Sequence, residues 1–183
     1  SGKDKTALNF LISKMYPENG GRIGTYFHLF PTYAQGKKVI WDGIDKKGFK
    51  VRDHFPPSEV RRTNDTEMQV ELRNGSIYQV IGTDKIDSIV GTNPVGCIYS
   101  EFALQNPRAY DMLSPILLEN EGWNIFNFTP RGHNHAEGLY RMAKATKGWY
   151  ASLLTVDDCR DEKGNPYVTQ EQIEQERARL LAQ

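Results

Sequence analysis

The sequence predicts an α/β fold with a mainly parallel central sheet, flanked by helices and extended by one antiparallel hairpin. Short apolar runs typical of buried strands alternate with segments whose apolar residues recur at helical spacing. Asn74-Gly75 lies between two runs of alternating apolar and polar residues, which is a strong hairpin signal. Two other apolar runs end in polar residues, and open parallel sheets bind ligands at such carboxyl ends.

The elements are expected in the following order. Apolar periodicity predicts helices over 6–16, 32–38 with an extension toward Trp41, 107–118 and 134–145, and a capping box of Thr169 and Gln172 predicts a last helix. Strands are expected over 25–30, 68–72, 77–81, 95–102, 123–128 and 149–156. No internal repeat or low-complexity linker interrupts them, so we expect a single domain over 1–183.

The composition narrows the class of protein. The chain has 183 residues, 38% hydrophobic and 25% charged, which suits a globular domain with a sizeable core. It contains no run of 18 apolar residues and does not begin with a secretory signal, so we expect no membrane partner. Cys97 and Cys159 are too few for a disulfide framework and indicate a reducing compartment.

The net charge is zero, but the charges are distributed unevenly. Between Lys37 and Arg62 the chain has eight basic residues, and the acidic residues concentrate toward the C-terminus. Such a basic stretch forms a solvated face or contacts a phosphate backbone. The candidates for DNA contact are Lys46, Lys47, Lys50 and Arg52.

A candidate phosphate-binding site opens the chain. The residues Gly2, Lys3, Asp4, Lys5 and Thr6 stand directly before a predicted helix. A glycine lets the backbone approach a phosphate, the start of a helix offers unpaired N–H groups, and a lysine neutralises phosphate oxygens. The same residues also suit an ordinary exposed helix start.

Two further candidates stand at strand ends. Ser100 and Glu101 follow the apolar run 95–99, and Thr129 follows the run 123–128. A glutamate beside a phosphate loop can orient and deprotonate the water that attacks a γ-phosphate. Thr129 would lie beside Glu101 if the two strands are neighbours. Each of these residues is also typical of an ordinary polar position at the end of a strand or in the turn that follows it.

Taken together, these motifs resemble the ATPase domain of phage terminase large subunits. The resemblance covers nearly the whole chain and rests on the segments GKDKTALNFLI, LRNGS, GTD, GTNP, YSEFA, NPR, LSPIL, GW and TPRGHNH. It implies a P-loop NTPase of the additional-strand class, an ATP- and Mg²⁺-dependent motor that moves double-stranded viral DNA into a procapsid. It also implies a homo-oligomeric ring in the host cell cytoplasm, with a portal protein and a small terminase subunit as partners.

The resemblance also implies roles for single residues. Lys3 corresponds to the Walker A lysine, Glu101 to the catalytic glutamate of Walker B, and Thr129 to the residue that couples hydrolysis to movement. Ser100 stands where many relatives have an aspartate that holds the Mg²⁺ water shell, and Asp4 stands at the usual Ser/Thr position. We therefore expect Asp4 and Ser100 to share the metal site, with Asp4 supplying the carboxylate.

Other parts of the family pattern are missing or unassigned. The strand that leads into a P-loop and the nuclease domain that follows it in relatives are not in this sequence, so we expect an N-terminally truncated ATPase domain with weak or absent turnover by itself. Five arginines stay open as the arginine finger: Arg61, Arg62, Arg73, Arg108 and Arg131. His133-Asn134-His135 is expected to cap a helix rather than bind metal.

Two other functions stay open at this point. One is a helicase-like ATPase stimulated by nucleic acid, and the other is a degenerate P-loop domain that serves assembly or DNA docking without catalysis. The departures at Asp4 and Ser100 favour the second alternative.

Overall fold

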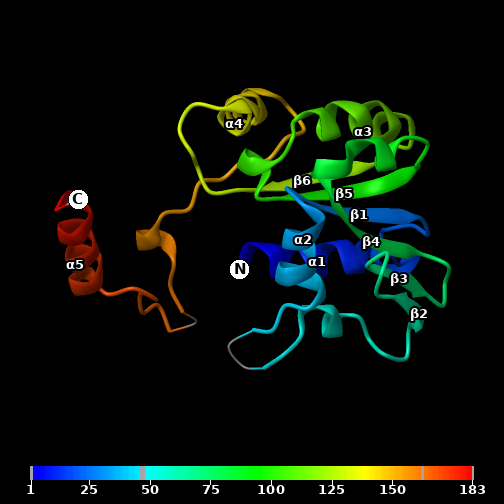
Figure 1. Cartoon of the computed structure of the whole chain (residues 1–183), viewed down its shortest axis with the longest axis horizontal. Helices are drawn as coiled ribbons and strands as arrows, with labels where there is room; N and C mark the ends of the chain where they lie inside the picture. The colour runs from blue at the N-terminus through cyan, green and yellow to red at the C-terminus, as the bar shows by residue number, and fades with distance from the viewer. Residues whose placement is uncertain (1, 46–47, 162, 183) are drawn as a thin grey trace. The chain divides into compact units, whose positions relative to one another are not determined.

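A six-stranded mixed sheet lies at the centre of residues 1–138 in the computed structural model of the protein (Figure 1). The structure describes residues 2–45, 48–161 and 163–182. The strands are β1 (Thr25–Phe30), β2 (Val60–Asn64), β3 (Gln69–Leu72), β4 (Ile77–Gly82), β5 (Pro94–Ser100) and β6 (Trp123–Asn127), in the spatial order β2-β3-β4-β1-β5-β6. Strands β4, β1, β5 and β6 are parallel, whereas β2, β3 and β4 pair antiparallel. This confirms the predicted α/β class.

Helices cover both faces of the sheet. Helices α1 (Gly2–Lys14) and α2 (Tyr33–Gly36) lie against one face, and α3 (Arg108–Glu119) lies against the other (Figure 1). Helix α2 continues into a π-helical turn over Lys37–Trp41, and Thr32 caps its start by accepting from the Gln35 N–H at 3.1 Å. Two later helices, α4 (His135–Ala145) and α5 (Gln170–Leu181), follow the last strand in the sequence.

The central strand β1 is buried on both faces, and its side chains alternate between them. Tyr26 and Phe30 belong to the apolar core under α1, and His28 between them faces the same side. A continuous apolar run is what a strand needs when helices cover both of its faces. His28 is the one polar residue beyond the first position of this strand, and it is completely buried.

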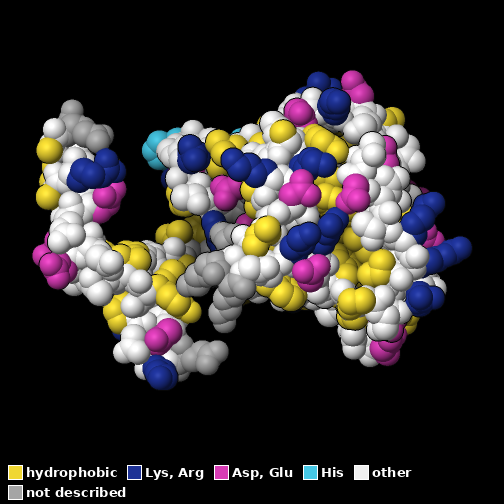
Figure 2. Space-filling view, turned by 60° about the horizontal axis from the view of Figure 1, so that its bottom comes forward, with side chains coloured by type: hydrophobic (Ala, Val, Ile, Leu, Met, Phe, Trp, Pro, Cys, Tyr) yellow, Lys and Arg dark blue, Asp and Glu magenta, His cyan; other side chains and the backbone are white. Residues whose placement is uncertain are grey.

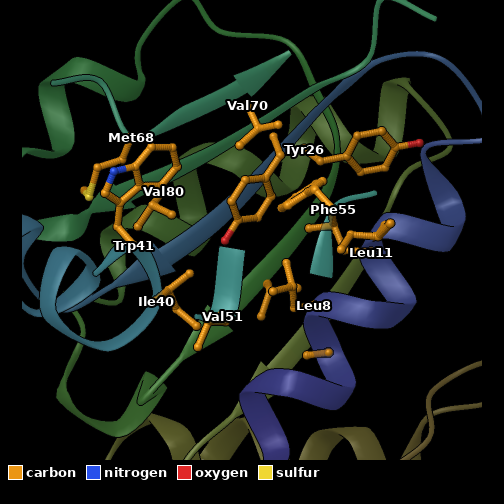
Figure 3. Packing of buried hydrophobic residues seen from close by; sticks show 14 of the residues in the cluster. Leu8, Leu11, Tyr26, Ile40, Trp41, Val51, Phe55, Met68, Val70 and Val80 are labelled. Atoms are coloured by element: carbon orange, nitrogen blue, oxygen red, sulfur yellow. The ribbon is translucent and has the colours of Figure 1, made fainter. Parts of the chain in front are cut away.

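The core under α1 joins the helix, the sheet and the segment after α2 (Figure 3). Leu8 and Leu11 are one helical turn apart and fully buried, and Trp41 packs beyond them against the sheet. Burial of each such side chain contributes about 1.5–3 kcal/mol. The Trp41 indole N–H donates to Asp65 Oδ1 at 2.8 Å, so this large ring enters the core without an unpaired donor.

Gly96 lets α1 and β6 close on the same face. A Cβ at this position would lie 2.5 Å from the Trp123 ring and 2.9 Å from the Tyr26 ring. Trp123 also packs edge-on against Phe10 of α1, with ring centroids 5.1 Å apart. The absence of a side chain at Gly96 therefore makes room for the aromatic contact that connects β6 to the helix.

The structure differs from the sequence predictions in three places. Helix α1 begins at Gly2 rather than at Thr6. Strand β2 was not predicted, because Val60–Asn64 is polar and mostly exposed and lacks the alternation of a half-buried strand. The strand predicted over 149–156 was wrong: these residues pair with no strand, and Tyr150 and Leu154 are 88% and 70% exposed.

Residues 139–183 form a second compact unit, whose boundary falls within α4. The predicted capping box of α5 is confirmed, because Thr169 Oγ1 accepts from the Gln172 N–H at 3.3 Å and Gln172 Oε1 accepts from the Thr169 N–H at 2.9 Å. The single domain expected over 1–183 stays a prediction. Among the residues that the structure describes, none of the helices combines the length and apolar character of a membrane span.

Candidate functional site

The start of α1 lies beside the carboxyl end of β6. Asn127 is the last residue of β6, and its Nδ2 donates to the Lys3 carbonyl oxygen at 3.3 Å. The first backbone N–H groups of a helix have no partner within the helix, and they carry the positive end of its dipole. The end of the sheet therefore holds the part of α1 that is suited to an anion.

Lys3 and Thr129 are 126 positions apart in the sequence and meet at this site. Lys3 Nζ donates to Thr129 Oγ1 at 3.4 Å, and both side chains lie at the surface. The other residues proposed for nucleotide binding are placed differently. The Thr6 hydroxyl donates to the Gly2 carbonyl within the helix at 3.1 Å, and Lys5 Nζ forms an ion pair with Asp45 at 2.6 Å.

A pocket of about 370 Å³ gathers three of the predicted site residues. Asp4, Glu101 and Thr129 line it together with Arg131. The remaining wall is formed by Phe30, Gln35, Val39 and Leu104. The prediction that Thr129 lies near Glu101 depended on β5 and β6 being neighbours, and the two strands pair directly in parallel. The pocket thus combines two carboxyl groups with a hydroxyl group and a guanidinium.

Glu101 has an uncommon backbone conformation directly after the carboxyl end of β5. Its φ is 56° and its ψ is 43°, in the left-handed backbone region that residues other than glycine rarely adopt. Gln105 fixes the preceding peptide, because its Nε2 donates to the Ser100 carbonyl at 2.8 Å and to the Leu29 carbonyl at 2.9 Å. Strain of this kind costs on the order of 1–3 kcal/mol and clusters at functional sites.

Asp4 and Ser100 form a buried pair behind the pocket. Ser100 Oγ donates to Asp4 Oδ1 at 2.7 Å, and Ser100 and Asp4 are 0% and 5% exposed respectively. Asp4 lines the pocket, whereas Ser100 is not among its lining residues. The two residues are in direct contact, and Asp4 is the one that presents a carboxylate to the pocket. Their part in a metal site stays a prediction.

The sequence did not reveal that His28 and Tyr78 extend this pair. His28 Nε2 lies 2.8 Å from Ser100 Oγ, and His28 Nδ1 lies 3.0 Å from the Tyr78 hydroxyl. Burial lowers the pKa of His28 to about 4, although the negative charge of Asp4 opposes that shift. Burial, with a smaller contribution from Asp4, raises the pKa of Tyr78. The only sequence signal is a lone histidine on the inward face of an apolar strand.

The donor set of the pocket fits Mg²⁺. Mg²⁺ prefers oxygen ligands and is usually held by one or two carboxylates with waters and substrate phosphates, and Asp4 and Glu101 supply two carboxylates here. Across the described part of the chain, no group of three or more His, Cys, Asp or Glu side chains could hold a metal ion by itself.

No family model matches the sequence. No curated protein matches it either. Solved structures do match. The large terminase ATPase domain of Thermus phage P74-26 superimposes with a TM-score of 0.57 at 18% identity, over 82% of this chain and 62% of that one. An arginine-to-alanine mutant of the same domain gives a TM-score of 0.56 at 17% identity, over 82% and 63% of the two chains.

A third match is the large terminase of a thermophilic bacteriophage, with a TM-score of 0.59 at 13% identity, over 85% of this chain and 37% of that one. The chain has the fold of a phage large terminase ATPase domain. This confirms the expected architecture of a mainly parallel sheet flanked by helices. The chain spans about three fifths of the two ATPase domain structures.

Within the terminase fold, the five open arginines differ in their surroundings. Arg61 and Arg62 both pair with Glu71, at 2.9 and 3.5 Å. Arg73 Nε donates to the Ser58 carbonyl at 2.8 Å. Arg131 is the one of the five that lines the pocket. Its guanidinium therefore adds a positive charge to the lining of the pocket.

The segment expected to contact DNA is described only in part. Lys46 and Lys47 lie outside the described residues. Lys50 is exposed, whereas Arg52 pairs with Asp65 at 2.8 Å and lies over the Trp41 ring at 5.6 Å. On the face seen in Figure 2, Lys and Arg side chains are interspersed with Asp and Glu. DNA contact by this segment of the terminase fold stays a prediction.

The histidines after β6 belong to the start of α4, as expected. Asn134 Oδ1 accepts from the Ala136 N–H at 3.0 Å and caps the helix. His133 Nδ1 lies 2.6 Å from Glu137 Oε2, and His135 Nε2 lies 2.7 Å from the Phe102 carbonyl oxygen. His135 therefore connects α4 to the turn that follows Glu101.

Proposed function

We propose that this chain binds and hydrolyses ATP with Mg²⁺ as the motor domain of a phage DNA-packaging terminase. The observation that carries the proposal is the pocket at the carboxyl ends of β5 and β6, lined by Asp4, Glu101 and Thr129. The terminase-like fold supports the same assignment. Double-stranded DNA as the substrate, a ring of identical subunits, and partnership with a portal protein and a small terminase subunit in the host cytoplasm belong to this proposal.

Each residue has a chemical task in this proposal. Lys3 and the first N–H groups of α1 neutralise the phosphates. Glu101 orients the attacking water and accepts its proton. Asp4 holds Mg²⁺, which when bound neutralises the phosphate oxygens. Thr129 contacts Lys3 Nζ and lies two residues after the end of β6, so a change at the phosphates reaches the segment that leads to α4.

Two substitutions separate binding from chemistry. In the natural full-length protein, Lys3→Ala is expected to weaken nucleotide binding about 10–100-fold, because it removes a charge-assisted contact worth about 1.5–3 kcal/mol. Glu101→Gln is expected to leave binding nearly unchanged and to slow turnover about 10²–10⁴-fold. Equilibrium binding of a fluorescent ATP analogue and phosphate release measure the two effects.

The matched controls are the same two substitutions at a lysine and a glutamate that do not line the pocket. Lys14→Ala removes a lysine at the other end of α1, and Glu119→Gln removes an exposed carboxylate at the end of α3. Both are expected to behave like wild type in both assays. Indifference of nucleotide binding to Lys3→Ala and of turnover to Glu101→Gln would instead indicate an assembly or docking module. Strand separation by an active enzyme would indicate a helicase.

A further inference from the structure

Four side chains from four elements form one buried hydrogen-bonded chain. Tyr78 of β4, His28 of β1, Ser100 of β5 and Asp4 of α1 follow one another at 3.0, 2.8 and 2.7 Å. Each of the four residues is at most 5% exposed. The chain therefore crosses three neighbouring strands and ends on the carboxyl group that lines the pocket.

The register of the sheet explains this geometry. His28 is paired with Val80 on β4 and with Ile98 on β5. Tyr78 lies two residues before Val80, and Ser100 lies two residues after Ile98. Because side chains two residues apart point to the same face of a strand, all three residues face α1. The chain thus runs diagonally across the sheet toward the carboxyl ends of the strands.

The protons of this chain have one consistent arrangement when Asp4 is ionised. Ser100 has a single proton, and it donates that proton to Asp4. The hydrogen bond between His28 and Ser100 then needs Nε2–H as the donor, which leaves Nδ1 to accept from the Tyr78 hydroxyl. Every donor in this hydrogen-bonded series from Tyr78 to Asp4 consequently points toward Asp4. A neutral imidazole with its proton on Nε2 meets this requirement.

Directed donors matter at this position because a buried carboxylate is costly without them. The hydroxyl of Ser100 would turn freely between Asp4 and other acceptors if its oxygen had no donor of its own. The His28 Nε2–H occupies that oxygen and leaves the Ser100 proton directed at Asp4. Tyr78 in turn fixes the imidazole ring and its tautomer.

We propose that His28, oriented by Tyr78, is a positioning residue that acts through Ser100 to hold the Asp4 carboxylate in place for Mg²⁺ and the nucleotide phosphates. The inference rests on the proposed function. It assigns a part in the metal site to His28 and Tyr78, although neither residue lines the pocket. Partners of this indirect kind change metal affinity about 10–100-fold when they are removed.

The experiment compares nucleotide binding with Mg²⁺ and with chelator in the natural full-length protein. His28→Leu is expected to raise the Mg²⁺ concentration that half-saturates ADP binding by about 10-fold or more. When a chelator removes Mg²⁺, the ADP affinity is expected to change less than about twofold. The contacts that Lys3 and the start of α1 make with the nucleotide do not depend on the hydrogen bonds from Tyr78 to Asp4. His28→Gln places an amide donor toward Ser100 and is expected to restore most of the Mg²⁺ response.

Tyr26→Phe is the matched control. Tyr26 lies two residues before His28 on the same face of β1, and its hydroxyl donates to the Lys14 and Arg22 carbonyls rather than to the chain. Tyr78→Phe removes only the far hydroxyl of the chain and is expected to shift the Mg²⁺ response in the same direction as His28→Leu. If His28 has only a structural role, His28→Leu and Tyr26→Phe are expected to give the same Mg²⁺ response. That result overturns the inference.

A measurement on the wild-type protein keeps the test independent of how the variants fold. Nitrogen-15 NMR of the His28 ring is expected to show the neutral tautomer with the proton on Nε2, and the Nδ1 tautomer or a charged ring at neutral pH overturns the inference. Failure of the proposed function has another signature: the wild-type protein then binds ADP with no dependence on Mg²⁺, or does not bind it.

Discussion

Asp4 and Ser100 exchange the chemical groups expected at their two positions. Many members of the family that the sequence resembles have a hydroxyl at the start of the helix and a carboxylate at the end of the strand. Here the carboxylate is on α1 and the hydroxyl is on β5, and Ser100 Oγ donates to Asp4 Oδ1 at 2.7 Å. The positive end of the α1 dipole favours a carboxylate in its first turn. The exchange therefore preserves the pair instead of removing it.

We expect the exchange to be reversible as a pair and harmful one residue at a time. Ser100→Asp sets two carboxylates against each other in a buried site, and Asp4→Ser leaves no carboxylate there. The double variant restores one hydroxyl and one carboxylate. Urea unfolding and the Mg²⁺ dependence of ADP binding are expected to show a coupling free energy of about 1–3 kcal/mol in favour of the double variant. Strict additivity of the two changes would contradict a shared site.

Glu101, which we propose as the catalytic base, illustrates how the end of an element sets the geometry of a side chain. Strand β5 stops at Ser100, the chain turns through a left-handed residue, and a short 3₁₀ turn over Phe102–Leu104 follows. Gln105, after that turn, reaches back to the carbonyls at the ends of β1 and β5. The direction of the Glu101 side chain thus depends on a residue four positions later in the sequence.

Gln105→Met is expected to destabilise the protein by about 1–3 kcal/mol, because two buried carbonyl oxygens lose their donor. Turnover is expected to fall as well, since the peptide before Glu101 is released. Gln79→Met is the control, because Gln79 also donates to a backbone carbonyl, of Glu67 at 3.3 Å, but in an exposed position. Thermal unfolding and phosphate release measure both effects. Equal behaviour of the two variants would show that Gln105 has no special role.

The sequence was sufficient for elements whose pattern is local. Strand β1 and the β3–β4 hairpin follow from apolar runs and from Asn74-Gly75, and Gly75 has the positive φ of 94° that the turn requires. Strand β2 was missed because an edge strand with little burial has no apolar alternation. Residues 149–156 have apolar side chains but no partner strand, so their composition predicted a strand that the structure lacks.

The candidate site was predictable only where a residue stands at the end of an element. Glu101 and Thr129 stand just beyond the ends of apolar runs, and parallel pairing of β5 with β6 brings them to one pocket. His28 and Gln105 gave no such signal. Their roles depend on which strands are neighbours and in what register, and one sequence does not contain that information. Lys5 was included because of its position, but its ammonium pairs with Asp45.

At the scale of the whole molecule, the buried His28 makes stability depend on pH. Its pKa is about 4 in the folded protein and about 6.5 when unfolded, so between these values the unfolded chain binds a proton that the folded chain does not. The contribution of the neutral His28 to the free energy of unfolding is therefore fully present above pH 6.5 and is lost as the pH falls toward 4.

We expect the free energy of unfolding to fall by on the order of 2 kcal/mol between pH 6.5 and 5, since one pKa unit corresponds to about 1.4 kcal/mol. In His28→Gln this part of the pH dependence is expected to disappear, because the amide does not titrate. Urea titrations followed by the fluorescence of the buried Trp41 at several pH values measure the slope for residues 1–138. If wild type and His28→Gln lose stability in parallel below pH 6.5, the ring is already protonated in the folded state. Nδ1 would then donate to the Tyr78 hydroxyl instead of accepting from it.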